Sequence, residues 1–303
     1  MRGQGALQEH REDQQAVVRA DELQASLYTG AGNRFVLLEV QAKEDRVESD
    51  GDAALCAFTR EICSQELFDG QRPDGFLLVS SDPQAAARMI LFNADGTRPE
   101  ACGNGLRCVG WHLARTRGLE RVEIVTDAGV RAVRMEESEK ERAYLSAEMG
   151  CAEFLGELNG PLPDVEFQAA QRFNLGNPHC VLLVDDERRA PLERVGNALQ
   201  GHPDFPQGVN VGFLARREGS WRLRVWERGV GETEACGTAA CAAAAFLGRR
   251  DGEQEHELHL TGGLLWVGGA FSEPLELRGW ASYHGELKIE APGEILQLSA
   301  WAT

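Results

Sequence analysis

The stretch "PEACGNGLRC" at residues 99–108 has a counterpart in the second half of the chain, "TEACGTAAC" at residues 233–241. Each copy reads Glu-Ala-Cys-Gly, then a small polar residue, then a run that can continue as a helix. We therefore predict two helices, which begin at or just after Cys102 and Cys236.

The residues that follow each copy support this prediction. Leu106, Val109 and Leu113 recur at helical spacing after the first copy, with Arg107 off that stripe. After the second copy, "AACAAAAFLG" at residues 239–248 is apolar on every side. A helix without a polar face is buried all round, so we expect the second helix to be central in its half.

The two halves share a plan around these helices. A Gly-Asn turn opens each half, "TGAGN" ending at Asn33 and "NLGNPH" containing Asn177, and strand-like runs and a Gly-rich turn follow. We predict a duplicated α/β (α+β) fold of two pseudo-symmetric domains, each a strand-rich, barrel-like sheet around a central helix, with the active site in the interdomain cleft. The strand-like runs, rich in Val, Leu, Ile and Phe, are residues 34–40, 75–80, 89–94, 121–126, 180–186, 209–215 and 221–227.

The domain limits follow from this plan. Residues 1–25 are polar and without apolar pattern, and we predict a flexible N-terminal extension there. We place the first domain at residues 26–146, the second at 147–280, and a C-terminal tail at 292–303. The charged run "RMEESEKER" suggests that the linker falls near residues 143–150.

Composition excludes several classes of function. The chain has 303 residues, of which 43% are hydrophobic and 26% charged, as in globular proteins, and its net charge is -17. That charge argues against a nucleic-acid partner or an anionic membrane surface, since both would need a basic face. No apolar run approaches the ~20 residues of a membrane span, and the N-terminus lacks the apolar segment of a secretory signal. We expect a cytoplasmic protein.

We expect neither a cofactor nor a metal. The three lysines, all in charged, surface-like contexts, offer no good candidate for a Schiff base; they are Lys43, Lys140 and Lys288. The eight cysteines contain no C-x-x-C pair, and no compact set of His, Cys and carboxylate ligands is evident.

A cysteine at the start of a helix suits acid–base chemistry. The unpaired N–H groups and the positive end of the helix dipole favour the thiolate and lower the thiol pKa. The same N–H groups can hold a carboxylate. If the two turns face each other across a cleft, one thiolate can remove an α-proton while the opposite thiol delivers one to the other face. The result is inversion of configuration, with the developing charge stabilised by the N–H groups.

In these residues the chain resembles the diaminopimelate epimerase family, whose members are cofactor-independent epimerases that use two cysteines. The resemblance lies in "GAGNRF", "LFNADGTRPEACGNGLRC", "LGNPHCVLLVDD", "FPQGVNVGF" and "VWERGVGETEACGTAACAA". It implies interconversion of LL- and meso-2,6-diaminopimelate, an isomerase reaction of lysine and peptidoglycan precursor biosynthesis. It also implies that "PLELRGWASYHGELKI" returns a last strand, about residues 281–291, to the first domain. The family often forms dimers, so a homodimer is an expected option beside the amino-acid substrate.

The resemblance assigns roles residue by residue. It implies that Cys102 and Cys236 are the acid–base pair, that His179 tunes a catalytic cysteine, and that Glu227 holds the substrate ammonium near a thiol. Arg228 suits a carboxylate through its bidentate fork. The remaining substrate-binding residues are the helix-start cradles Gly103, Asn104, Gly237 and Thr238 and the asparagines Asn33, Asn93, Asn177 and Asn210.

Four positions depart from the family pattern. Thr29 stands where the first loop usually has His, and Arg34 where it has Asp. Gly75 cannot supply the side-chain contact that a Gln makes in some members, and Ala239 replaces a usual Gly. None belongs to the proton-transfer pair, but they bear on which amino acid is accepted.

Two alternatives to this reading stay open. One is another pyridoxal-independent two-cysteine amino-acid racemase of the same fold, with a different side-chain pocket. The other, from a different class, is a redox-sensing dithiol protein, which would have no use for the Asn and Arg cluster.

Overall fold

The computed structural model describes residues 22–40, 52–100, 102–160, 162 and 165–290. The tail predicted at 292–303 and most of the extension predicted at 1–25 lie outside these residues. The extension was predicted too long, because the first strand already begins at Glu22.

The first half contains β1 (Glu22–Gly30), β2 (Asn33–Val40), α1 (Asp52–Ile62), β3 (Gly75–Ser80), β4 (Ala87–Asn93), α2 (Gly103–Arg117), β5 (Arg121–Thr126), β6 (Gly129–Glu139) and β7 (Arg142–Glu148). The second half contains β8 (Glu153–Glu157), β9 (Ala169–Asn174), β10 (Pro178–Leu183), α3 (Leu192–Leu199), β11 (Asn210–Arg217), β12 (Ser220–Glu227), β13 (Gly231–Thr233), α4 (Gly237–Asp251), β14 (Glu255–Leu260), β15 (Gly263–Gly268) and β16 (Glu276–Glu290).

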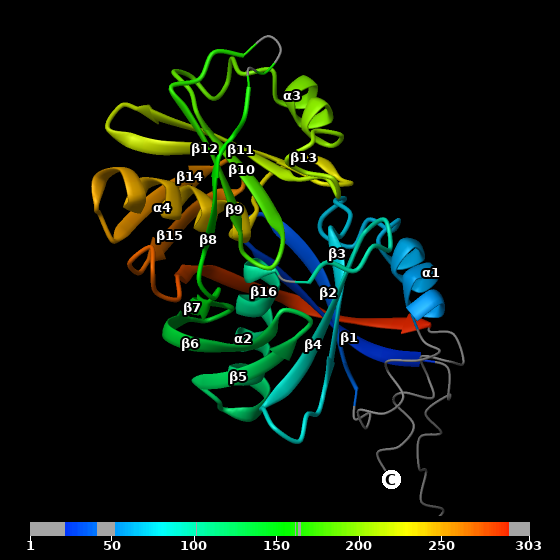
Figure 1. Cartoon of the computed structure of the whole chain (residues 1–303). Helices are drawn as coiled ribbons and strands as arrows, with labels where there is room; N and C mark the ends of the chain where they lie inside the picture. The colour runs from blue at the N-terminus through cyan, green and yellow to red at the C-terminus, as the bar shows by residue number, and fades with distance from the viewer. Residues whose placement is uncertain (1–21, 41–51, 101, 161, 163–164, 291–303) are drawn as a thin grey trace, which may run out of the picture.

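Both halves wrap strands around one buried helix (Figure 1). In the first half the order β1-β2-β3-β4-β5-β6-β7-β16 closes on itself, because β1 also pairs with β16. In the second half the order continues β16-β15-β14-β12-β11-β10-β9-β8, with no pairing between its two ends among the described strands. The two sheets enclose α2 and α4 respectively, so the predicted fold class is confirmed.

The internal repeat is visible in strand pairing. β2 pairs parallel with β3 across α1, and β10 pairs parallel with β11 across α3. β4 and β5 are likewise parallel across α2, as β12 and β14 are across α4. Each unit therefore places its buried helix between two parallel strands, and each helix N-terminus follows directly on the turn after a strand end.

β16 belongs to both halves. Its first residues pair with β15 on one edge and β7 on the other, and from Ala281 onward it pairs with β1. The prediction of a linker near residues 143–150 is wrong, because residues 142–148 form strand β7. The chain therefore passes between the halves within the continuous sheet. The exact domain limits remain a prediction.

One large core cluster joins the residues around α2 and α4, and smaller clusters lie beneath α1 and α3. α4 is buried from Gly237 to Leu247, as its composition predicted. α2 differs from expectation at Arg107, which we placed off the apolar stripe and which is fully buried. None of the helices in the described part of the chain is long and apolar enough to cross a membrane.

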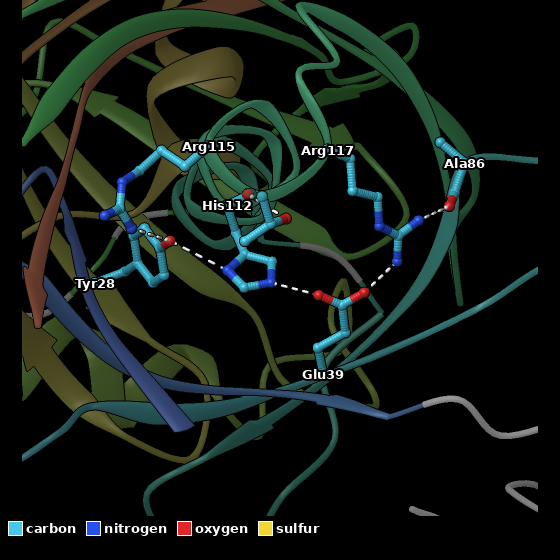
Figure 2. Close-up of polar contacts among 7 residues, drawn as sticks. Tyr28, Glu39, Ala86, His112, Arg115 and Arg117 are labelled. Atoms are coloured by element: carbon cyan, nitrogen blue, oxygen red, sulfur yellow. Dashed lines mark hydrogen bonds and ion pairs between the residues drawn. The ribbon is translucent and has the colours of Figure 1, made fainter. Parts of the chain in front are cut away.

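A polar network anchors the C-terminal part of α2 (Figure 2). The His112 Nε2 atom lies 2.7 Å from a Glu39 carboxylate oxygen, and Nδ1 lies 3.1 Å from the Tyr28 hydroxyl. Arg115 donates to that hydroxyl at 3.2 Å, and Arg117 pairs with the other Glu39 oxygen. These contacts fix the end of the helix remote from Cys102.

Candidate active site

The N-termini of α2 and α4 meet tip to tip. Cys102 and Cys236 are their N-cap residues, both with extended backbone. A methyl group added to Gly237 would lie 3.4 Å from the Gly103 Cα atom. Leu277 of the shared strand packs against both tips, since the same methyl would meet its Cδ2 atom at 2.7 Å and one on Gly103 would clash with that atom as well. Only glycine at both positions permits this approach.

Both cysteines line one cavity of about 440 Å³ in front of the helix tips. Both are free thiols, Cys236 buried and Cys102 partly exposed. Of the residues that we predicted for the site, those that also line this cavity are Asn33, Asn93, Asn104, Asn177, Asn210, Glu227, Arg228, Gly237 and Thr238. Gly103 lies at the tip of α2 but does not line the cavity. His179 is buried behind the cavity wall.

The repeat explains why these residues converge. Asn33 opens β2, and Asn177 immediately precedes β10 at the equivalent point. Asn93 ends β4 as Glu227 ends β12, each just before the turn that leads to a cysteine-capped helix. The ends of the strands surround the helix N-termini, so side chains at these ends all face the same cavity.

Hydrogen bonds fix the asparagines. The Asn104 side chain donates to the Asn33 Oδ1 atom at 2.7 Å. Asn210 accepts from the Arg228 backbone N–H at 2.9 Å and donates to the Pro178 carbonyl at 3.3 Å. These bonds leave part of each amide free to face a ligand, as a preorganised polar wall requires.

His179 is placed differently from its predicted role. Its side chain is 1% exposed, and its Nε2 atom donates to the Asn177 Oδ1 atom at 2.9 Å. Burial lowers the pKa of His179 to about 3, with the nearby Arg228 charge as a smaller cause. The imidazole is therefore neutral. Its contact orients Asn177, and tuning of a cysteine by His179 stays a prediction.

The thiols are less acidic than we predicted. Burial raises the pKa of Cys102 to about 11, although the Gly105 N–H, 3.3 Å from Sγ, favours the thiolate. Burial and the Glu227 carboxylate raise the pKa of Cys236 well above its usual value. The expectation of lowered pKa values was wrong because desolvation of a charge exceeds what one or two helix N–H groups return. Both thiols are protonated in the free protein.

Glu227 interacts directly with the second thiol. It accepts a hydrogen bond from the Thr233 hydroxyl at 2.6 Å and another from the Cys236 thiol. Burial raises the pKa of Glu227, and both hydrogen bonds oppose that rise. The carboxylate is thus held beside the sulfur, where it can bind an ammonium group or receive a proton.

Three of the four departures from the family pattern lie around the first loop. Arg34 lines the cavity and is tied to Asp74, whose carboxylate accepts the Arg34 backbone N–H at 2.7 Å. Thr29 shares a 2.9 Å hydrogen bond with His284. A side chain at Gly75 would meet the Phe92 carbonyl at 2.7 Å, so this glycine is required by the close approach of β4. Ala239 is buried in α4.

The sequence reasoning missed two features of the site. The cavity wall carries carboxylates that we did not single out, namely Asp74, Asp95, Glu100, Glu232 and Glu234. Arg107 lies behind the wall and donates to the Asn104 Oδ1 atom at 2.7 Å. Its position directly before Cys108 inside the cysteine motif was the available signal.

Several solved structures share this fold. A predicted epimerase from Pseudomonas aeruginosa superposes with a TM-score of 0.68 at 19% identity, covering 89% of this chain and 100% of that one. A hydroxyproline epimerase from Agrobacterium vitis gives a TM-score of 0.63 at 16% identity, covering 90% and 94%. At these identities the likeness concerns the fold alone.

Proteins of similar sequence identify the family as well as the fold. The diaminopimelate epimerase of Moorella thermoacetica is 37% identical over 258 residues, covering 78% of this chain and 88% of the relative. That of Bacillus cereus (strain AH187) is 34% identical over 285 residues, covering 86% and 96%. The family model described as diaminopimelate epimerase matches residues 25–155 and 173–268, which include both cysteine turns. The chain therefore belongs to the diaminopimelate epimerase family, whose members are isomerases.

Proposed function

We propose that this protein interconverts LL- and meso-2,6-diaminopimelate by transferring the α-proton between Cys102 and Cys236. The observation that carries the proposal is the meeting of two cysteine-capped helix N-termini at one cavity. The family's relatives are named for this activity. The reaction would serve lysine and peptidoglycan precursor synthesis, with a cytoplasmic enzyme, a small amino-acid substrate and neither nucleic acid nor membrane as a partner.

The proposed step balances without a cofactor. One cysteine, as thiolate, takes the α-proton and becomes a thiol, and the C–H electron pair passes into the carboxylate as an enolate. The opposite cysteine, as thiol, gives its proton to the other face of the α-carbon and becomes the thiolate. The backbone N–H groups at both helix tips stabilise the charge on the enolate oxygens. The configuration is inverted and no electrons leave the substrate.

Substrate binding would supply the missing thiolate. Both thiols are protonated at rest because burial disfavours their charge. An α-ammonium group beside Glu227 would bring a positive charge next to Cys236, which favours the thiolate form. Glu227 already accepts a hydrogen bond from that thiol, so proton movement between them needs no rearrangement.

The remaining wall suits a substrate with a second charged end. Arg228 and the asparagines can hold the distal carboxylate, and the wall carboxylates can hold the distal ammonium. Arg34, held against Asp74, is a feature of this chain that favours testing a second candidate, a racemase for another amino acid. A comparison of activity on diaminopimelate, glutamate, histidine and proline separates the two.

The experiment follows deuterium from solvent into the α-position of diaminopimelate, with wild type, Cys102→Ser and Cys236→Ser compared. We expect each substitution to slow interconversion by about 10²–10⁴-fold, the usual contribution of an acid or base. Interconversion at the wild-type rate in either variant would contradict the two-cysteine mechanism. A dithiol sensor would instead show a reversible disulfide and no exchange in the wild type.

A further inference from the structure

Arg107 is the largest fully buried side chain in the described part of the chain, with 0% exposure. Its Nη2 atom donates to the Asn104 Oδ1 atom at 2.7 Å. Its Nε and Nη1 atoms have no hydrogen-bond partner among the described residues. A buried charge is costly unless it is paired, so this guanidinium calls for a physical explanation.

The groups that face Arg107 are neutral at rest. They are Cys102 and Cys108 of α2, Cys241 of α4 and Tyr144 of β7. On β16, the absence of a side chain at Gly279 makes room, since a methyl there would lie 3.4 Å from the Arg107 Nη2 atom. These groups are close enough to interact electrostatically with the guanidinium, and it gains a counter-charge from them only when one of them loses its proton.

Arg107 also reaches the cavity wall through two amides. Because the Asn104 Oδ1 atom accepts from Arg107, its Nδ2 atom is turned toward Asn33, to which it donates at 2.7 Å. This relay fixes the orientation of two wall residues. Arg107 itself does not line the cavity.

Only one of the two repeated helices carries this positive charge. Arg107 lies five residues after Cys102, and the residue five after Cys236 is Cys241. The second helix therefore has an uncharged thiol where the first has a guanidinium. Glu227 raises the pKa of both thiols, but only Cys236 also shares a hydrogen bond with it, and only Cys102 has Arg107 as an opposing positive charge.

We propose that Arg107 is the built-in counter-cation of the thiol pair, which orients Asn104 and Asn33 and makes Cys102 the thiol that ionises more readily. It is a positioning residue, because it touches neither the cavity nor the substrate. The role of Arg107 in catalysis rests on the proposed epimerisation. Its effect on the ionisation of Cys102 does not, because that effect is already present in the free protein.

The test measures the rate at which iodoacetamide alkylates Cys102 as a function of pH, by peptide mass mapping of the full-length protein. The variant is Arg107→Gln, and the matched control is Arg115→Gln, which removes an arginine from the remote end of the same helix. We expect the midpoint for Cys102 to rise by about one pH unit or more in Arg107→Gln, a tenfold loss of thiolate at fixed pH. The control should leave the midpoint in place.

A folded Arg107→Gln protein with an unchanged Cys102 midpoint would overturn the proposal, whatever its turnover. If that variant does not fold, Arg107→Lys decides, because it keeps a cation at the site. Its midpoint should stay close to that of wild type, and a rise of a full unit would refute the counter-cation. Alkylation does not depend on turnover, so a shifted midpoint without α-proton exchange on diaminopimelate would instead disprove the proposed function.

Discussion

Replacing Gly237 by alanine tests the contact between the two helix tips. The added methyl would lie 2.7 Å from the Leu277 Cδ2 atom and 3.4 Å from the Gly103 Cα atom. Carbon atoms pack at about 3.5–4.0 Å, so the Leu277 methyl must move by roughly 1 Å and the tips must separate by roughly a few tenths of an ångström. A misplacement of about 1 Å can cost about 10²-fold in rate, so for this smaller shift of the tips we expect kcat/KM to fall about tenfold.

The effect on stability should be smaller. Alanine improves helix propensity over glycine by about 0.5–1 kcal/mol, whereas overpacking of a core costs about 1–3 kcal/mol. We therefore expect a net loss of about 0.5–2 kcal/mol in the free energy of unfolding. Activity and stability are thus predicted to separate, which a purely structural defect would not do.

The assay compares α-proton exchange and thermal unfolding in four proteins. Leu277→Val removes the methyl that clashes, so Gly237→Ala/Leu277→Val should recover most of the lost activity. Gly201→Ala is the control, because a methyl there would meet nothing within 4 Å. A Gly237→Ala protein with wild-type kcat/KM, or one that Leu277→Val does not rescue, would refute the tip-to-tip geometry.

Three further predictions concern charge and cofactors. The partners of Glu39 lower its pKa from 4.5 to about 2, so Glu39→Gln should lose about 1–3 kcal/mol at pH 7 after allowing for partial screening. Because the folded pKa is depressed, this difference from wild type should shrink as the pH falls from about 4.5 toward 2 in denaturant titrations. Glu227→Gln should move the alkylation midpoint of Cys236 downward, since the carboxylate raises the pKa of that thiol, yet turnover should fall. An unmoved or raised midpoint would contradict this placement of the charge. Added EDTA or pyridoxal phosphate should leave exchange rates unchanged, and a large response to either would exclude the two-thiol mechanism.

Local patterns predicted much of the fold. The paired cysteine turns fixed both central helices, which begin at Gly103 and Gly237. The apolar runs bounded by turn residues became strands within a few residues of the expected limits. These features depend on short-range spacing, which one sequence shows directly. The grouping of the four asparagines in one site was implied by the resemblance to the family.

What the sequence did not predict depends on burial and on long-range pairing. Arg107 looked like a polar-face residue because helical spacing cannot show that α4 and β7 close over it. The thiol pKa values moved upward because the degree of desolvation is set by the whole cavity wall. His179 proved to contact Asn177, a detail of side-chain orientation that no motif encodes.

The shared strand has a consequence for synthesis on the ribosome. Residues 22–30, near the beginning of the chain, complete their sheet only with residues 281–290, near its end. The nascent first half must therefore wait with the unpaired edges of β1 and β7 exposed, and open strand edges invite aggregation. The second half can assemble most of its strands earlier, so the part translated first would be the last to close.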